Sequence, residues 1–241
     1  MNDLQRKLLL VTLGPYLWLQ GKYVRHVTPR LPEPDGPRSG SCGQGPRLRL
    51  LIAGDSAAAG VGASTQAQGL SGQLVQRLAV HFSVQWQLAA VTGHDSPALH
   101  GLLSALPEQH FDVVVVSIGV NDVTALRSPR QWVGWQATLA DLIRQRFGAR
   151  LIVHSALPPM HAFTALPQPL RWYFGRWAQE MNRQLAIELH AHPRRVLHSA
   201  HMDQPAQGLA SDGFHPGPQG YAVWAESLSA HIRAAVAARA D

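Results

Sequence analysis

A regular alternation of short apolar runs with stretches of helical spacing is the feature that most constrains how this chain can fold. Each run has the length of a strand and contains at least one β-branched residue, which favours strands. The runs are Leu48–Ala53, Val84–Val91, Val113–Ile118, Leu151–His154 and Val196–His198. Runs without regular polar alternation are typical of parallel strands that are covered on both faces. We therefore expect a mostly parallel five-stranded sheet.

Helices are predicted in the intervals between these runs. Ser96 with Pro97 and Ser128 with Pro129 are typical helix starts, because Ser caps a helix and Pro fits its first turn. Gly148 is a typical residue to end the second of these helices. Further helices are predicted around Leu70–Leu78, over Leu170–Ala191 and over Pro218–Ala238. Strands that alternate with helices predict an α/β fold, a flavodoxin-like three-layer α/β/α sandwich.

The chain is long enough for one substantial core, and its length fits one domain better than two. It has 241 residues, of which 46% are hydrophobic and 15% charged, a globular composition. Residues 28–46 contain several Pro and Gly and are predicted to be a linker or a meandering arm. We therefore divide the chain into an apolar N-terminal segment (1–27), this linker (28–46) and a folded domain (47–241).

The N-terminal segment allows more than one interpretation. Arg6 and Lys7 precede the apolar run Leu8–Leu19, which resembles a signal peptide, but no small-x-small cleavage site follows it. The run is also too short for a normal membrane span. It is therefore either an uncleaved interfacial anchor with peripheral membrane contact or a helix that packs on the domain. A cytoplasmic, a membrane-associated and an exported location all fit.

Charge and cysteine content exclude several classes of partner and cofactor. The formal net charge of +6 comes from 21 Lys and Arg against 15 Asp and Glu, and the cations are scattered. No basic stripe interleaved with aromatic residues predicts nucleic-acid binding. The single cysteine, Cys42, permits no intrachain disulfide and no Cys-based zinc site. Since the histidines lack ligand spacing as well, we expect no metal and no cofactor.

Three polar motifs lie at the boundaries of the predicted elements. Gly54–Ser56 follows the first predicted strand, Gly119–Asp122 follows the third, and Asp212–Pro216 precedes the last helix. Each motif alone is weak evidence, but all three occur in order and at such boundaries. In α/β sheets the active groups gather at the carboxyl ends of the strands. The motifs are therefore expected to meet in one site.

The residue types in these motifs suit nucleophilic catalysis. A serine hydroxyl needs an adjacent base to become a nucleophile, and Ser56 is placed where a strand turns toward a helix. His215 is a suitable base because an unperturbed imidazole titrates near neutrality. Asp212, three residues earlier, can hold the His215 ring in the required tautomer. The side-chain amide of Asn121 can donate to an oxyanion.

These motifs resemble those of the GDSL, or SGNH, hydrolase family over about residues 48–235. The first block is GDSAAAG, the third is GVND and the fifth is DGFHP. The resemblance implies that Ser56 is the nucleophile and that Asp212 and His215 are the acid and base. Ala57 replaces the Leu of the GDSL name, at a variable position. Residues 47–241 are thus expected to be an SGNH hydrolase domain.

The resemblance also implies an oxyanion hole. Its second-block glycine is best matched by Gly93, in the sequence TGHDS after the second predicted strand, although His94 makes this block less typical. The hole would comprise the backbone N–H groups of Ser56 and Gly93 and the side-chain amide of Asn121.

An apolar stretch over residues 158–177 follows the fourth predicted strand. One interpretation is an ordinary core helix with a packed approach loop. The other is an apolar lip for an acyl chain, in which Met160, Phe163 and Leu166 bind substrate.

Together these patterns predict a serine hydrolase that cleaves carboxylic esters through an acyl-enzyme intermediate. The expected partner is a small-molecule or lipid ester with a short- to medium-chain acyl group. Alternatives are a carbohydrate O-deacetylase, an acyltransferase on the same residues, or a catalytically silent binding module of the same fold. The intact Ser56, Asn121, Asp212 and His215 argue against the silent module.

Overall fold

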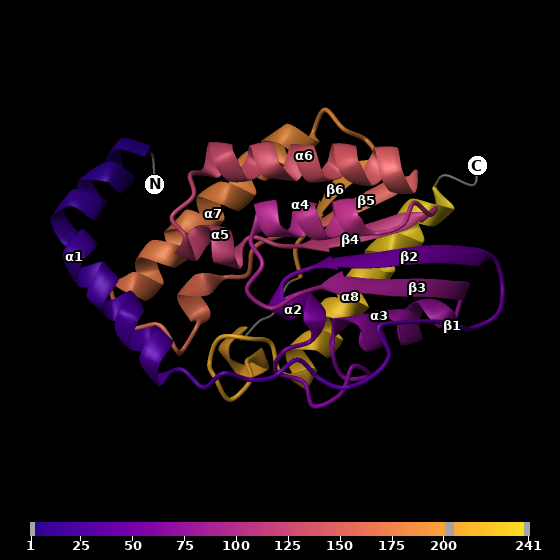
Figure 1. Ribbon diagram of the computed structural model, residues 1–241, viewed down its shortest axis with the longest axis horizontal. Helices are drawn as coiled ribbons and strands as arrows, with labels where there is room; N and C mark the ends of the chain where they lie inside the picture. Colours follow the sequence, from indigo (N-terminus) through magenta and orange to yellow (C-terminus); the bar gives the residue numbers. More distant parts are fainter. Residues whose placement is uncertain (1–2, 201–204, 239–241) are drawn as a thin grey trace.

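One sheet forms the centre of the molecule in the computed structural model, which describes residues 3–200 and 205–238 (Figure 1). Within these residues the sheet has six strands in the order β1-β3-β2-β4-β5-β6. Their bounds are β1 Ser39–Cys42, β2 Arg47–Gly54, β3 Ser83–Ala90, β4 Val113–Ser117, β5 Leu151–Ser155 and β6 Arg195–His198. All neighbouring strands pair in parallel except β1, which is antiparallel to β3.

The predicted α/β/α fold and its mostly parallel sheet are confirmed, but the predicted number of strands was wrong. The additional strand β1 lies inside the segment expected to be a linker and pairs Ser39–Cys42 with the edge of β3. Its four residues, SGSC, are all exposed. An edge strand of small polar residues has neither apolar alternation nor a buried face, so the sequence pattern does not reveal it.

Helices cover both faces of the sheet, which explains the continuous apolar runs. Helices α3 (Leu70–Ala79) and α8 (Pro218–Ala237) lie on one face, and α4 (Ser96–Ala105) and α6 (Pro129–Phe147) lie on the other. Along β2, Leu50 and Ile52 contact the first pair of helices, whereas Leu51 and Ala53 contact the second. Helix α7 (Leu170–Leu189) packs against α6 and β6.

The predicted helix starts are partly corrected by the capping geometry. Ser128 caps α6 as predicted, in a capping box with Gln131, and Gly148 ends that helix in the left-handed region. At α4 the cap is Asp95 rather than Ser96, because the Asp95 carboxylate accepts the N–H of Ala98 at 3.1 Å. Ser96 is thereby free for a different contact, described below.

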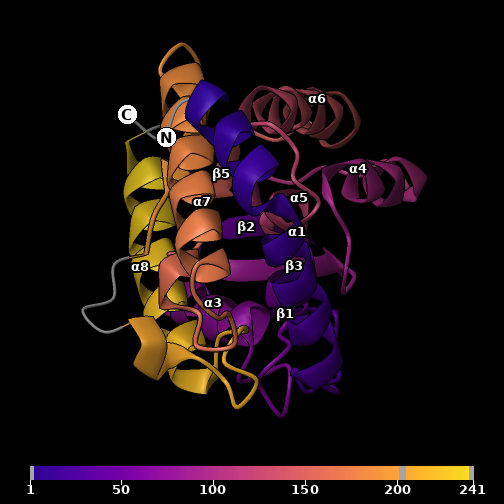
Figure 2. The same cartoon turned by 90° about the vertical axis from the view of Figure 1, so that its left-hand side faces the viewer.

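The N-terminal segment forms one long helix, α1 (Asp3–Val27), that packs against α7 (Figure 2). Leu17 and Val24 are buried on its inner side. The Gln20 side chain donates to the carbonyl of Gln168 at 2.7 Å and accepts the N–H of Leu170 at 3.1 Å. Of the two interpretations, the structure therefore contains the helix that packs on the domain. Among the described helices, none combines the length and apolarity needed to cross a membrane.

The strand order determines where a site can form. The chain passes from β2 to β3 on one side and then returns to β4 on the other side of β2. Such a reversal opens a crevice at the carboxyl ends of the central strands. Three short helices lie near these ends: α2 (Ser56–Ala59), α5 (Val120–Thr124) and the 3₁₀ helix η1 (Met160–Ala162). The loops that follow β2 and β4 therefore leave the sheet side by side.

Candidate active site

Ser56 is the first residue of α2, directly beyond the carboxyl end of β2. The residue before it, Asp55, caps this short helix by accepting the N–H of Ala57 at 3.1 Å. Asp55 takes the capping role that Ser56 would otherwise have, so the Ser56 hydroxyl is available for another partner. Its Oγ lies 2.9 Å from Nε2 of His215, although the two residues are 159 positions apart in the chain.

His215 is held from its other side by Asp212. The Nδ1 atom of His215 lies 2.6 Å from Oδ2 of Asp212. The second carboxylate oxygen, Oδ1, accepts the backbone N–H groups of Phe214 and His215, each at 3.0 Å. These bonds close the short turn before α8 and fix the carboxylate relative to the imidazole ring. The structure thus brings Ser56, His215 and Asp212 into one hydrogen-bonded chain.

The pKa values of the two carboxylates of this site are shifted in opposite directions. Burial alone would raise the pKa of Asp212, but the hydrogen bonds from His215 and from the backbone of Phe214 and His215 lower it more, so the pKa lies below its usual 3.8. Burial raises the pKa of Asp55 to about 7, despite its hydrogen bond to Ala57. Asp212 is therefore an anion near neutral pH, as a partner of an imidazolium must be.

Asn121 is linked to the Gly93 loop through His94, the residue that follows Gly93. The side-chain amide of Asn121 donates to the carbonyl oxygen of His94 at 2.8 Å, next to Gly93. Gly93 has φ +84° and open space where a Cβ would be, so this turn exposes its backbone. The loops start together, because Val91 N–H donates to Gly54 O and Asp55 N–H donates to Ser117 O.

A buried carboxylate ties these two loops together a second time. Asp122, fully buried, accepts the N–H of Ser96 at 3.1 Å and its hydroxyl at 2.9 Å. Arg127 forms ion pairs with both Asp122 and Asp95. Burial raises the pKa of Asp122 to about 6, against the effect of its Ser96 hydrogen bonds. Asp122 therefore fixes the Asn121 loop relative to the Gly93 loop.

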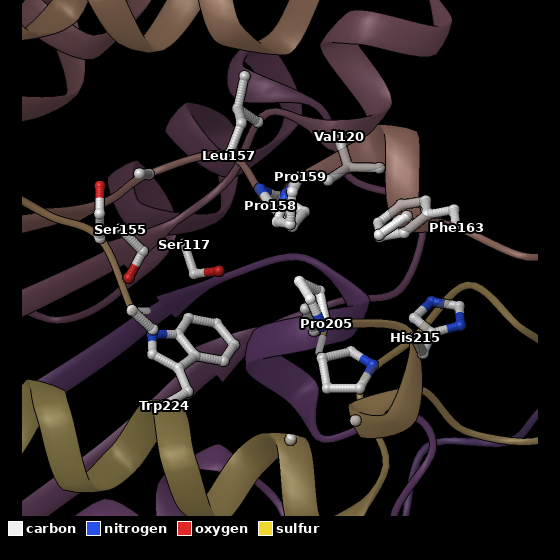
Figure 3. A pocket seen from close by; sticks show the side chains of 18 of the residues that line it. Ser117, Val120, Ser155, Leu157, Pro158, Pro159, Phe163, Pro205, His215 and Trp224 are labelled. Atoms are coloured by element: carbon white, nitrogen blue, oxygen red, sulfur yellow. The ribbon is translucent and has the colours of Figure 1, made fainter. Parts of the chain in front are cut away.

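A cavity of about 430 Å³ opens beside Ser56 and His215 (Figure 3). Its apolar wall includes Val120, Leu157 and Phe163, of which Phe163 lies beside His215. Phe163 packs against Phe214 with the two rings tilted and their centroids 4.8 Å apart, and Phe214 in turn contacts the His215 ring edge-on. The cavity therefore has an apolar surface directly next to the hydrogen-bonded chain of Ser56, His215 and Asp212.

Of the three predicted substrate-binding residues, only Phe163 borders this cavity. Met160 and Leu166 are buried in the hydrophobic cluster that η1 forms with α7 and are not among the residues lining the cavity. Residues 158–177 therefore contain both core residues and part of the cavity wall, and Met160 and Leu166 share one hydrophobic cluster with Phe163.

Sequence reasoning missed a set of polar residues at the far strand ends. Ser155 is the last residue of β5 and His198 is the last residue of β6, and both line the cavity. Their position at the carboxyl ends of two predicted strands was the only available signal. Single Ser and His residues are common, so without a recognisable motif this position did not mark them as functional.

Comparisons with known proteins show similarity to one family of esterases and lipases. A family model described as GDSL-like Lipase/Acylhydrolase family matches residues 52–223. The GDSL-like esterase Rv1075c of Mycobacterium tuberculosis is 29% identical over 209 residues, which are 80% of this chain and 64% of that protein. The chain thus spans less than two thirds of the length of this relative.

Solved structures share the fold at low sequence identity. A carbohydrate esterase family 2 enzyme of Corynascus thermopiles, with its carbohydrate binding domain, superposes with a TM-score of 0.64 at 15% identity, covering 85% of this chain and 69% of that one. A member of the lipolytic protein G-D-S-L family from Veillonella parvula gives a TM-score of 0.60 at 14% identity, covering 74% and 94%.

Proposed function

Because the chain belongs to the GDSL-like lipase/acylhydrolase family, we propose that it hydrolyses carboxylic esters through an acyl-enzyme intermediate formed on Ser56. The observation that supports this most directly is the hydrogen-bonded chain from Asp212 Oδ2 through His215 to Ser56 Oγ, with distances of 2.6 and 2.9 Å. The relative named GDSL-like esterase agrees with this reaction class.

In the first half of the reaction, Ser56 Oγ attacks the ester carbonyl carbon while its proton passes to Nε2 of His215. The carbonyl oxygen becomes an oxyanion, which the N–H groups of Ser56 and Gly93 and the amide of Asn121 stabilise. The tetrahedral intermediate then expels the alcohol, which takes the proton from His215. The acyl group remains on Ser56 as an ester.

In the second half, water replaces the alcohol. His215 takes a proton from the water molecule as its oxygen attacks the acyl carbon, and the same oxyanion forms again. The intermediate expels Ser56, which recovers the proton from His215, and the carboxylic acid leaves. Asp212 keeps its negative charge in both halves and stabilises the imidazolium of His215.

The cavity supports an acyl group of short to medium length as the substrate. Its apolar wall includes Leu157 and Phe163, against which methylene groups of a substrate can be buried. Each buried methylene contributes up to about 0.8 kcal/mol. The wall is limited in extent, because the cavity has only about 430 Å³.

A fluorophosphonate probe tests the proposed nucleophile, because such probes react with an activated serine. We expect one adduct per chain, located on Ser56 by peptide mass spectrometry. Ser229→Ala is a matched control, since Ser229 is buried on α8 and donates to Glu226 O. Labelling must disappear in Ser56→Ala and persist in the control. An unlabelled wild-type chain would indicate a silent binding module of the same fold.

We further propose that α1 contacts an anionic lipid surface. Its outer side exposes large apolar and aromatic side chains, namely Leu8, Val11, Tyr16, Trp18, Leu19, Tyr23 and Val27. Lys22 lies on the same side, with its Nζ 3.9 Å from the Trp18 ring centroid. Aromatic residues beside cations are typical of helices that lie in the membrane interface. Contacts from Leu17 and Gln20 to the α7 region fix the opposite side to the domain.

Sedimentation with vesicles tests this contact. Wild-type protein should bind vesicles of phosphatidylcholine and phosphatidylglycerol more tightly than vesicles of phosphatidylcholine alone, and salt should weaken the difference. Trp18→Glu and Tyr23→Glu should each reduce binding severalfold. Val80→Glu is the matched control, because Val80 is an exposed apolar residue beyond α3. Equal binding by all variants would contradict the contact.

A further inference from the structure

Three parallel strands end on a polar residue at the same edge of the sheet. Ser117, Ser155 and His198 are the last residues of β4, β5 and β6. Ser155 and His198 are register partners, so their side chains point to the same face. Two residues earlier, Val115 and Val153 pack in the core cluster with α3 and α8. All three polar residues line the cavity from this face.

Two of these side chains have a buried polar atom without a hydrogen-bond partner among the described residues. Ser155 is 6% exposed and His198 is 5% exposed. Neither Ser155 Oγ nor His198 Nε2 has a hydrogen-bond partner in the part of the chain that the structure describes. Buried polar atoms are nearly always bonded, because an unpaired one costs free energy. Their position in the cavity wall indicates that the missing partner is a group that enters the cavity.

The chemistry of these atoms selects a neutral group. Burial, and secondarily the neighbouring His231, lowers the pKa of His198 to about 4, so its imidazole is neutral at pH 7. Ser117 and Ser155 are neutral as well, and Trp224 adds an aromatic face to this end of the cavity. Among the described residues that line this end of the cavity, none carries a charge that would match an ammonium or a carboxylate. A hydroxyl group both donates and accepts, so it suits the serine hydroxyls and either imidazole tautomer.

Ser155 and His198 lie apart from the reacting serine, whereas Ser117 lies on the strand next to β2. Figure 3 shows Ser117, Ser155 and Trp224 at one end of the cavity and Phe163 and His215 at the other. Strand spacing gives the scale, since β5 is two strands and β6 three strands from β2, about 10 and 14 Å. A group bonded to Ser155 and His198 therefore belongs to a part of the substrate remote from the ester bond.

We propose that the cavity end formed by Ser117, Ser155, His198 and Trp224 is a subsite for a hydroxyl group on a long arm of the ester substrate. The inference rests on the proposed ester hydrolysis. A plain alkyl arm would remove water from Ser155 and His198 without replacing its hydrogen bonds, whereas a hydroxylated arm replaces them. The arm is either the acyl group or the alcohol, and the experiment separates the two.

Two matched pairs of esters test the subsite. The acyl pair is p-nitrophenyl octanoate and p-nitrophenyl 8-hydroxyoctanoate, and the alcohol pair is octyl acetate and 8-hydroxyoctyl acetate. In the pair whose long arm enters the cavity, we expect kcat/KM to be about tenfold higher for the hydroxylated ester. The other pair should show no preference. Equal kcat/KM values within both pairs for the wild-type enzyme would overturn the proposal. Water, and not a substrate hydroxyl, would then be the partner of Ser155 and His198.

Substitutions assign the preference to these side chains. Ser155→Ala removes one unpartnered oxygen, and His198→Phe removes the ring nitrogens while keeping an aromatic ring next to His231. Each should reduce the tenfold ratio to about two or less. Ser229→Ala, the matched buried control, should keep the wild-type ratio. A ratio unchanged in both cavity variants would overturn the assignment. The ratio is internal to each enzyme, and the wild-type comparison stands even if a variant misfolds.

The failure of this subsite is distinguishable from the failure of the proposed function. Turnover of all four esters without a hydroxyl preference would contradict the subsite alone, whereas absence of any turnover would contradict the ester hydrolysis. Calorimetric titration with 1,8-octanediol and 1-octanol supplies a readout that needs no turnover. The diol should bind more tightly to the wild type than to His198→Phe, and equal binding would overturn the subsite.

Discussion

At the scale of single residues, the site depends on which side chains already have partners. Asp55 caps α2 and Asp95 caps α4, and this leaves Ser56 for His215 and Ser96 for Asp122. The two Asp residues preceding Ser occupy the capping positions that the serines could have filled. The effect of substituting one of these residues therefore depends on its hydrogen-bond partners and not on its residue type alone.

Substitution of the hydrogen-bonded residues should give unequal losses. Ser56→Ala and His215→Ala should each lower kcat roughly 10⁶-fold, because a nucleophile and its base act as one unit, and Asp212→Asn should cost roughly 10⁴-fold. Asn at position 212 can still accept the N–H groups of Phe214 and His215. Stopped assays on p-nitrophenyl acetate measure kcat. An active Ser56→Ala enzyme would contradict the assigned nucleophile.

Asn121 is expected to act in the transition state. Asn121→Ala should lower kcat roughly a hundredfold, equivalent to about 3 kcal/mol, with a smaller effect on KM. One amide hydrogen bonds to His94 O, and the second remains for the oxyanion. Steady-state kinetics and a melting curve separate this role from a structural one. If only the melting temperature falls, Asn121 merely holds the turn.

At the scale of elements, one segment both fills the core and borders the site. The segment from β5 through η1 to α7 places Leu157 and Phe163 at the cavity, while Met160, Leu166 and Leu170 pack in the cluster beneath. The same cluster includes Leu17 and Val24 of α1. The wall of the cavity and the N-terminal helix are thus parts of one packed unit.

Chain-length dependence should reveal the extent of this wall. For p-nitrophenyl esters we expect kcat/KM to rise from acetyl to butyryl or hexanoyl, by up to about 0.8 kcal/mol per methylene, and then to fall. The fall is expected where the chain passes Phe163 and meets Ser155 and His198. Phe163→Ala should flatten the rise.

Leu166→Ala is the comparison variant, because Leu166 is buried behind the wall and does not line the cavity. It should lower the free energy of unfolding by about 2–5 kcal/mol and change the chain-length profile less than Phe163→Ala does. Urea unfolding and the same ester series measure the two effects. Equal losses on short and long esters in Phe163→Ala would show that Phe163 is only structural.

At the scale of the whole molecule, global stability should fall in acid. The folded-state pKa of His198 is lowered to about 4 and that of His154 to about 3, in both cases mainly by burial. Below pH 6.5 these two histidines bind protons in the unfolded chain but not in the folded chain. Their contribution to the free energy of unfolding is therefore fully present above pH 6.5 and decreases toward pH 4. The raised pKa values of Asp55, about 7, and Asp122, about 6, act in the opposite direction above about pH 4.

A single variant isolates one of these contributions. His198→Phe should reduce the loss of stability between pH 7.5 and pH 4 by up to about 3 kcal/mol, because its ring does not titrate. Urea unfolding of the wild type and the variant at both pH values measures the difference. An identical loss in the two proteins would show that His198 is protonated as readily in the folded chain as in the unfolded one.

The sequence alone determined the layers of the fold and the residues proposed for catalysis. Continuous apolar runs can be satisfied only by strands covered on both faces, and Leu50 and Leu51 indeed pack on opposite sides of β2. Ser56, Asn121, Asp212 and His215 were predicted because their motifs follow or precede such elements. For Asp212 and His215 the spacing along the chain is sufficient for the prediction, since the two residues form their hydrogen bond within one short turn.

Only the tertiary structure decided the features that depend on residues distant in sequence. β1 became a strand because the edge of β3 offers its backbone groups, not because of its own side chains. Ser155 and His198 became neighbours through the pairing of β5 with β6. Ser155 Oγ and His198 Nε2 are buried without partners because of how the whole cavity wall packs. A local sequence pattern cannot predict this, since it does not show which distant residues surround an atom.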